Sequence, residues 1–297
     1  MVFSELFQHV DTVIDIALCN QQKIDDLKKI GQLLYWNGIC GLKMGKYHHA
    51  LESLLKGCEI ENGCEERTNK KDCEFCRGIS QAYSELGQIE EAERWLKKAN
   101  LSEVAHHSDL GNLHFNAQRW NEALDEYAVS FSLCKNDTDR GVIANSIAIV
   151  HLTGKQDWYT AWQYFQPALH LLEDENVSDE VKARLFNTLA QMQAMKGDLD
   201  FALQIYETLL VMRKKIYGEN HPDVARVYQN IGGVYAEKGK KALALNNWEM
   251  AAMMFISVSG KDNVHTKQCV TNICNYLLTN GTEQELEAIL TRLGYRG

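Results

Sequence analysis

Four cysteines that lie within nineteen residues are the densest group of possible metal ligands in the sequence. They are Cys58, Cys64, Cys73 and Cys76, and two residues separate the last two, a spacing that is common among zinc ligands. A structural zinc site usually shows two such short pairs, and only one is present. Cys76 also falls on a position that we expect to be buried, where cysteine acts as a small apolar residue. We therefore expect no metal, and a zinc or thiol-redox site at these cysteines stays an alternative that metal analysis of the purified protein can decide.

Two histidine pairs, at 48–49 and 106–107, and Cys134 are the other groups that could take part in catalysis. The sequence has no G-x-S-x-G, P-loop, G-x-G-x-x-G or H-E-x-x-H motif. No nucleophile, base and oxyanion donor can be assembled from these residues. We expect core or surface histidines, no cofactor and no enzymatic activity.

A pattern of glycine and alanine that recurs along the chain predicts the helices on which these cysteines and histidines lie. A glycine is followed five residues later by alanine in the pairs Gly45–Ala50, Gly87–Ala92, Gly197–Ala202 and Gly239–Ala244. Ala123 and Ala161 take the same place in two units with a different turn, Gln118 standing at the glycine position before Ala123. A large apolar residue follows each alanine by four positions, at Leu54, Leu96, Tyr127, Phe165, Tyr206 and Trp248. The pattern predicts two helices per unit, with a left-handed turn at the glycine and alanine at the helix contact.

The unit that carries this pattern most clearly is Tyr228-x2-Ile231-Gly232-x2-Tyr235 followed by Ala244-x3-Trp248. It resembles the tetratricopeptide repeat. The alanine spacings of 42, 31, 38, 41 and 42 residues mostly exceed the common 34, and the usual proline at the end of each unit is missing. In both respects the chain is similar to kinesin light chain and nephrocystin-type repeats, most of all over residues 217–240.

This resemblance implies an all-α fold, a right-handed α-solenoid of about six to seven helix pairs with terminal capping helices. We expect residues 1–297 to form one domain. Within it, residues 1–27 are an N-terminal cap helix, 28–258 are six repeat units, and 259–297 are a degenerate seventh unit or C-terminal cap.

Asparagines recur at one position of the expected groove. The resemblance implies that the residue nine positions before each turn glycine faces the concave surface, which in the C-terminal half gives Thr188 and the three asparagines Asn145, Asn230 and Asn272. An amide side chain offers a donor and an acceptor together and can pair with an extended peptide backbone. The alternative is that these asparagines are merely solvated.

Two arginines, Arg184 and Arg226, lie one helical turn before that position in neighbouring units. Two guanidinium groups on one wall of the groove could hold a carboxylate or a phosphate. The alternative is that each pairs with a nearby acid, for instance Glu180 or Asp223.

Tyr35 and Trp36 make the N-terminal groove apolar and could anchor an apolar side chain of a ligand. The alternative is packing against the N-terminal helix. The apolar residues of that helix are Phe3, Leu6, Phe7, Val10, Val13 and Ile14.

Charge and hydropathy exclude several classes of protein. With 31 basic and 40 acidic residues the net charge is −9, which argues against a nucleic-acid partner. No apolar run is long enough to span a membrane, and the N-terminus lacks the basic head of a signal peptide, so we expect a cytoplasmic protein with reduced cysteines.

The function that we expect is a non-enzymatic adaptor, which binds a linear peptide or a helix of another protein in its concave groove. The alternative is a fixed scaffold subunit of a cytoskeletal, ciliary or trafficking assembly that has no exchangeable ligand. The sequence indicates neither the identity of the partner nor the oligomeric state.

Overall fold

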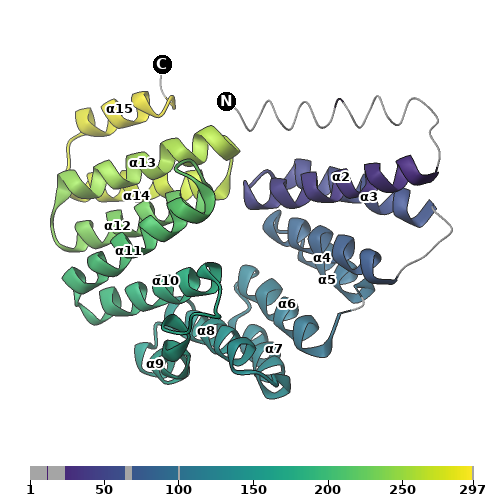
Figure 1. Cartoon of the computed structure of the whole chain (residues 1–297). Coiled ribbons are helices and arrows are strands. Elements are labelled where there is room, and N and C mark those ends of the chain that lie inside the picture. The colour runs from purple at the N-terminus through teal and green to yellow at the C-terminus, as the bar shows by residue number, and fades with distance from the viewer. Residues whose placement is uncertain (1–11, 13–23, 64–68, 100, 296–297) are drawn as a thin grey trace. The chain divides into compact units, whose positions relative to one another are not determined.

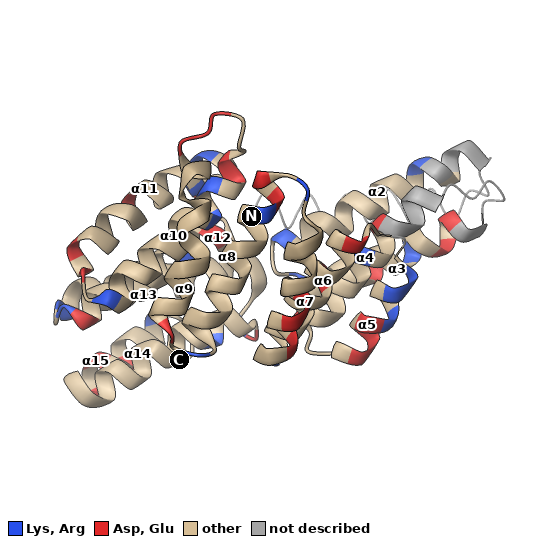
Figure 2. Cartoon of the chain, turned by 90° about the horizontal axis from the view of Figure 1, so that it is seen from below, with Lys and Arg blue, Asp and Glu red and all other residues tan. Residues whose placement is uncertain are grey.

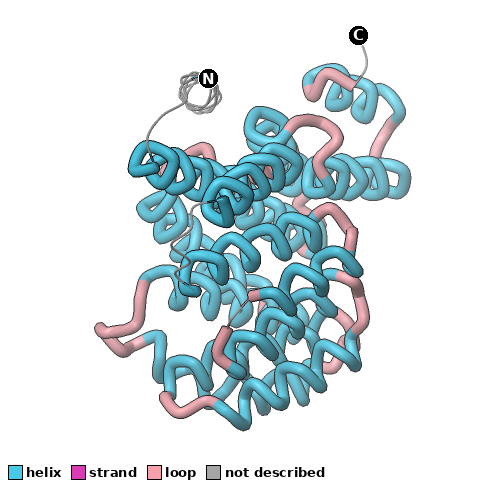
Figure 3. Tube along the Cα trace, turned by 90° about the vertical axis from the view of Figure 1, so that its right-hand side faces the viewer, coloured by secondary structure: helices cyan, strands magenta, loops and turns pink. Residues whose placement is uncertain are grey.

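The computed structural model describes residues 12, 24–63, 69–99 and 101–295. Across these residues the chain forms helices α2 to α15 and one 3-10 helix, and no strand (Figures 1 and 3). The prediction of an all-α fold is confirmed.

The chain divides into two compact units, Met1–Lys135 and Asn136–Gly297, here called the N-terminal unit and the C-terminal unit. The helices of the N-terminal unit are α2 (Ile24–Lys43), α3 (Tyr47–Gly63), α4 (Asn69–Glu85), α5 (Ile89–Lys98), α6 (Glu103–Asn116) and α7 (Trp120–Leu133). Those of the C-terminal unit are α8 (Asp137–Thr153), α9 (Trp158–Phe165), the 3-10 helix η1 (Gln166–Leu172), α10 (Asp179–Lys196), α11 (Leu199–Tyr217), α12 (Pro222–Glu237), α13 (Lys241–Ser259), α14 (Val264–Asn280) and α15 (Glu283–Arg292). The expected single domain stays a prediction.

Consecutive helices pair as the sequence pattern predicts, and within each unit a pair contacts the next pair, as in an α-solenoid. Gly197 joins α10 to α11 with a φ of 92°, a left-handed conformation that glycine adopts without steric cost. Gln118 takes the same role between α6 and α7 with a φ of 58°. Gln118 stands at the position that glycine takes in other units, and the turn keeps its left-handed conformation although glutamine has a side chain.

The alanines at the helix contact are buried at all six predicted positions, and so are the six large apolar residues that follow them. Pro167 ends α9, because proline has no backbone N–H for the next helical hydrogen bond. The chain continues there as η1, which begins at Gln166.

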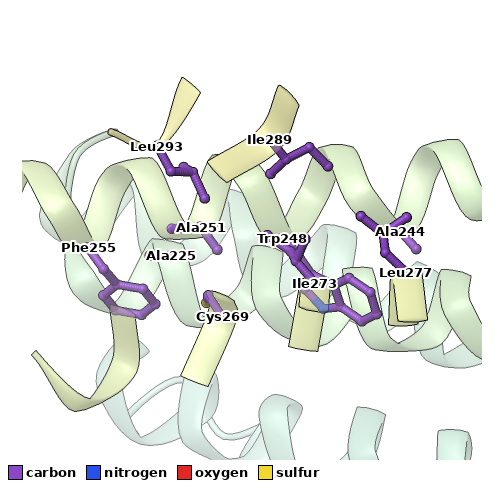
Figure 4. Packing of buried hydrophobic residues seen from close by; sticks show 11 residues of the cluster. Ala225, Ala244, Trp248, Ala251, Phe255, Cys269, Ile273, Leu277, Ile289 and Leu293 are labelled. Carbon is purple, nitrogen blue, oxygen red and sulfur yellow. The ribbon is translucent and has the colours of Figure 1, made fainter. Parts of the chain in front are cut away.

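The last four helices share one apolar core (Figure 4). Trp248 of α13 lies against Gly232 of α12, and its indole Nε1 donates a hydrogen bond to the carbonyl oxygen of Gln229 at 3.0 Å. A Cβ atom at Gly232 would lie 2.5 Å from Cδ1 of that indole, whereas a Cβ atom at the next residue, Gly233, would meet no atom within 4 Å. The two adjacent glycines therefore have different structural roles.

This difference predicts opposite effects of the same substitution. Gly232→Ala forces the rigid indole out of place and is expected to lower the free energy of unfolding by about 1–3 kcal/mol. Gly233→Ala removes only the backbone flexibility of a glycine within a helix. This substitution is expected to raise the free energy of unfolding by about 0.5–1 kcal/mol. Urea unfolding followed by circular dichroism measures both, and equal stability of the two variants would contradict the packing.

Candidate functional site

Polar side chains of α10, α12 and α14 form a connected surface in the C-terminal unit. On α12, Arg226, Asn230 and Gly233 are spaced four and three residues apart and so lie on one side of the helix. Hydrogen bonds connect this side to α10 and to α14. We call this surface the polar face; it consists of Arg184, Asn187, Arg226, Asn230, Gly233, His265, Gln268 and Asn272.

Asn230 of α12 donates a hydrogen bond from Nδ2 to Oδ1 of Asn187 on α10, at 3.1 Å. The groove position predicted for α10 is Thr188, which is 0% exposed and whose hydroxyl binds the carbonyl oxygen of Arg184. Sequence reasoning therefore missed Asn187 by one residue. A lone asparagine beside the expected position was the only signal that could have found it.

The other two predicted asparagines differ in exposure. Asn272 is half-buried on α14, and its Oδ1 accepts a hydrogen bond from Gln268 at 3.0 Å. Asn145 on α8 is 1% exposed, and its Oδ1 has no hydrogen-bond partner in the described part of the chain. In this structure Asn145 does not reach solvent, so the polar face contains Asn230 and Asn272 but not Asn145.

The two predicted arginines also differ. Arg226 lies 3.8 Å from Oδ1 of Asp223 and 3.4 Å from Nε2 of His265, and half of its side chain is exposed. Arg184 is exposed and has no ionic partner among the residues that the structure describes. Its expected partner, Glu180, instead binds Arg213 at 3.4 Å. Arg184 is therefore an available cation, whereas Arg226 shares its charge with a neighbouring carboxylate.

His265 at the start of α14 lies between the ring of Phe255 and the guanidinium of Arg226. Burial, and secondly the charge of Arg226, lower the pKa of His265 to about 4, although Asp223 opposes this shift. At neutral pH the ring is uncharged, and Nε2 can accept the hydrogen bond from Arg226. Charged residues are otherwise sparse along α14, whose one formally charged residue is Lys267 (Figure 2). The positive charge of the polar face therefore comes from Arg184 and Arg226.

The lowered pKa of His265 predicts a loss of stability in acid. The imidazole has a pKa near 6.5 in the unfolded chain, so below that pH the unfolded state binds the proton more strongly than the folded state. The free energy of unfolding should fall between pH 6.5 and 4 by roughly 1–3 kcal/mol more in the wild type than in His265→Gln. Urea unfolding of both chains at several pH values tests this, and parallel pH profiles would refute it.

Tyr35 and Trp36 lie in the N-terminal unit. Tyr35 is half-buried, with its ring edge-to-face against Phe75 and Trp36 at centroid distances of 5.2 and 5.3 Å, and burial raises the pKa of its hydroxyl. Trp36 is 62% exposed. Tyr35 is thus part of an aromatic cluster, and Trp36 is the one of the two that a ligand or another segment could contact.

The cysteine cluster is only partly described. Cys58 is buried in an apolar core with Leu54 and Phe75, and Cys76 is also buried. Cys64 lies outside the described residues, and the structure gives no side-chain placement for Cys73. Within the described residues no three His, Cys, Asp or Glu side chains are grouped as metal ligands. The metal-free expectation stays a prediction.

None of the helices in the described part of the chain has both the length and the apolar character needed to cross a bilayer. The expected absence of enzymatic activity stays a prediction.

Comparison with known proteins gives matches to repeat models, to a longer protein and to solved structures. Models of the tetratricopeptide repeat match residues 181–252, which contain most of α10, all of α11 and α12 and most of α13, and residues 78–101. A clustered mitochondria protein homolog from Debaryomyces hansenii is 26% identical over 110 residues, which are 37% of this chain and 8% of that protein.

Solved structures resemble the chain over most of its length. A Rap protein in complex with competence and sporulation factor has a TM-score of 0.63 at 15% identity, over 89% of this chain and 75% of that one. BtubC from P. vanneervenii has a TM-score of 0.53 at 18% identity, over 77% of this chain and 91% of that one. In the Cut9–Hcn1 complex of the APC/C, the similar chain has a TM-score of 0.55 at 16% identity, over 90% of this chain and 46% of that one. At these identities the likeness shows the fold.

Both matched ranges contain paired helices, a left-handed glycine turn and a buried alanine at the helix contact. Repeats of this kind stack into surfaces that bind other proteins, which indicates an adaptor or scaffold role. The chain therefore contains tetratricopeptide repeats at residues 78–101 and 181–252.

Proposed function

We propose that the polar face of the C-terminal unit binds an extended, acidic peptide segment of a partner protein. The observation that carries this proposal is the amide pair of Asn187 and Asn230. In that pair Nδ2 of Asn187 and Oδ1 of Asn230 have no further partner among the described residues. They offer one donor and one acceptor, which is what the C=O and N–H groups of an extended backbone require.

Arg184 supplies the preference for acidic residues. It lies three residues before Asn187 on α10, so both side chains lie on the same side of that helix. A carboxylate of the peptide next to the backbone-binding amides would form a charge-assisted hydrogen bond with the guanidinium. No internal ion pair has to be broken first.

Gly233 keeps the surface of α12 open beside Asn230. A side chain at that position would meet no atom of the folded chain within 4 Å, so a peptide backbone can approach the helix closely there. The same space gives a way to block the face without disturbing the core.

A second candidate is the fixed scaffold. Large apolar side chains are exposed on the second helices of the C-terminal unit, at Phe201, Val211, Leu243, Met250 and Met253. Such residues are suited to permanent protein contacts. A scaffold of this kind predicts that substitutions on the polar face leave assembly unchanged.

The proposal is tested with peptides selected from a random display library on the immobilised full chain and then measured one by one by fluorescence anisotropy. Selected peptides should be rich in Asp and Glu. Arg184→Glu should weaken the binding of these peptides by roughly 10- to 100-fold, because a charge-assisted hydrogen bond with the peptide carboxylate is replaced by repulsion between two carboxylates. Asn230→Ala should weaken peptide binding about 2- to 10-fold, and Gly233→Trp should abolish it.

Two variants on α11 serve as matched controls. Val211→Trp adds the same indole to a second helix, and Lys215→Glu reverses an exposed charge there; both should bind like the wild type. If no peptide is selected, or if polar-face and control variants bind the selected peptides equally, the peptide-binding proposal is wrong and the scaffold takes its place.

A further inference from the structure

Arg213 of α11 is a buried cation, with 8% of its surface exposed. Its Nη1 lies 3.4 Å from Oε1 of Glu180, at the start of α10. The same atom lies 3.9 Å from Oδ2 of Asp223, at the start of α12. One buried guanidinium thus faces a carboxylate from each of two helices that carry the polar face.

Tyr217, one turn after Arg213 on α11, holds the other oxygen of Glu180. Its hydroxyl donates a hydrogen bond to Oε2 of Glu180, while Oε1 accepts one from Arg213. The ring of Tyr217 stacks on the ring of His221 at a centroid distance of 4.2 Å. Burial, and secondly the hydrogen bond to Glu180, raise the pKa of the hydroxyl, so it remains a donor at neutral pH. Both oxygens of the carboxylate are therefore bound to α11.

Each of these two carboxylates also lies one helical turn before an arginine of the polar face. Glu180 precedes Arg184 by four residues, a spacing at which an acid and a base on one helix form an ion pair. Arg184 nevertheless has no ionic partner among the residues that the structure describes. Asp223 precedes Arg226 by three residues and keeps a contact of 3.8 Å with it. Arg213 and the two exposed arginines thus share the same two acids.

We propose that Arg213 is a positioning residue of the polar face, which holds Glu180 and Asp223 at α11 and so keeps Arg184 and Arg226 available to an acidic ligand. The inference rests on the proposed binding of an acidic segment. An uncharged side chain at position 213 would release both carboxylates. They would then pair with the exposed arginines and repel the carboxylates of the ligand.

The state of Arg184 can be measured without a ligand. Phenylglyoxal reacts with the deprotonated guanidine, and a neighbouring carboxylate slows the reaction because it stabilises the protonated form. In the native full-length chain, Arg213→Gln should lower the modification rate of Arg184 about twofold, as followed by peptide mass spectrometry. Arg213→Gln/Glu180→Gln should restore the rate, because the acid that would pair with Arg184 is gone. Arg292, which pairs with Glu249, is the internal reference and should react equally in all chains.

Peptide binding measures the consequence at the polar face. The probe is a fluorescein-labelled oligoglutamate peptide, followed by fluorescence anisotropy. Arg213→Gln should weaken its binding roughly 3- to 10-fold, and Arg213→Gln/Glu180→Gln should regain most of the affinity. The control Lys215→Gln removes the same charge from α11 but releases Asp179, which lies 3.3 Å from that lysine. This control should bind the probe like the wild type.

The outcomes separate the role of Arg213 from the proposed function. Failure of the wild type to bind oligoglutamate contradicts the proposed function, while the rates at Arg184 still decide whether Arg213 holds Glu180. An unchanged rate in Arg213→Gln overturns the inference. A double variant that stays as slow and binds as weakly as Arg213→Gln also overturns it, because only a structural role then remains. Tyr217→Phe keeps the buried cation and should slow Arg184 in the same direction, so the test does not depend on the folding of Arg213→Gln.

Discussion

The close approach of the two helices in each pair is the constraint on which the rest of the structure depends. A small residue of the first helix lies against a large residue sixteen positions later on the second, as in Gly38 with Leu54, Gly111 with Tyr127 and Gly232 with Trp248. A Cβ atom at Gly111 would lie 2.5 Å from the ring of Tyr127. The helices can therefore stay close only where this position is small, and the buried alanines extend the same contact along the second helix.

This constraint explains why so much of the fold could be predicted from the sequence. A contact that recurs at fixed spacing within one unit leaves a local pattern of glycine, alanine and large apolar residues, and the structure follows it even at Gln118. The candidate site depends on other distances. The hydrogen bond between Arg226 and His265 joins residues 39 positions apart, and no repeated spacing records it.

The same reasoning accounts for the misplaced residues. Neighbouring positions on a helix point about 100° apart, so a register error of one residue exchanges a buried side chain for an exposed one. Thr188 and Asn187 differ in this way. Asn145 matches the register of Asn230, yet the packing around α8 buries it. The periodicity thus predicts which side of a helix faces outward, while the accessibility of one side chain depends on its neighbours in three dimensions.

Gly232 and Gly233 show how one helix serves both the core and the surface. Gly232 points toward Trp248, where any side chain would separate the helices, and Gly233 points toward open space beside Asn230. Because the core contact is fixed by Gly232 and its neighbours, the other side of α12 is free to carry polar residues without loss of packing. The ion pair of Arg226 with Asp223 is half exposed and long, so its exchange for a ligand carboxylate costs little. A substitution at Gly233 can therefore change the binding properties of the polar face without disturbing the packing of Gly232 against Trp248.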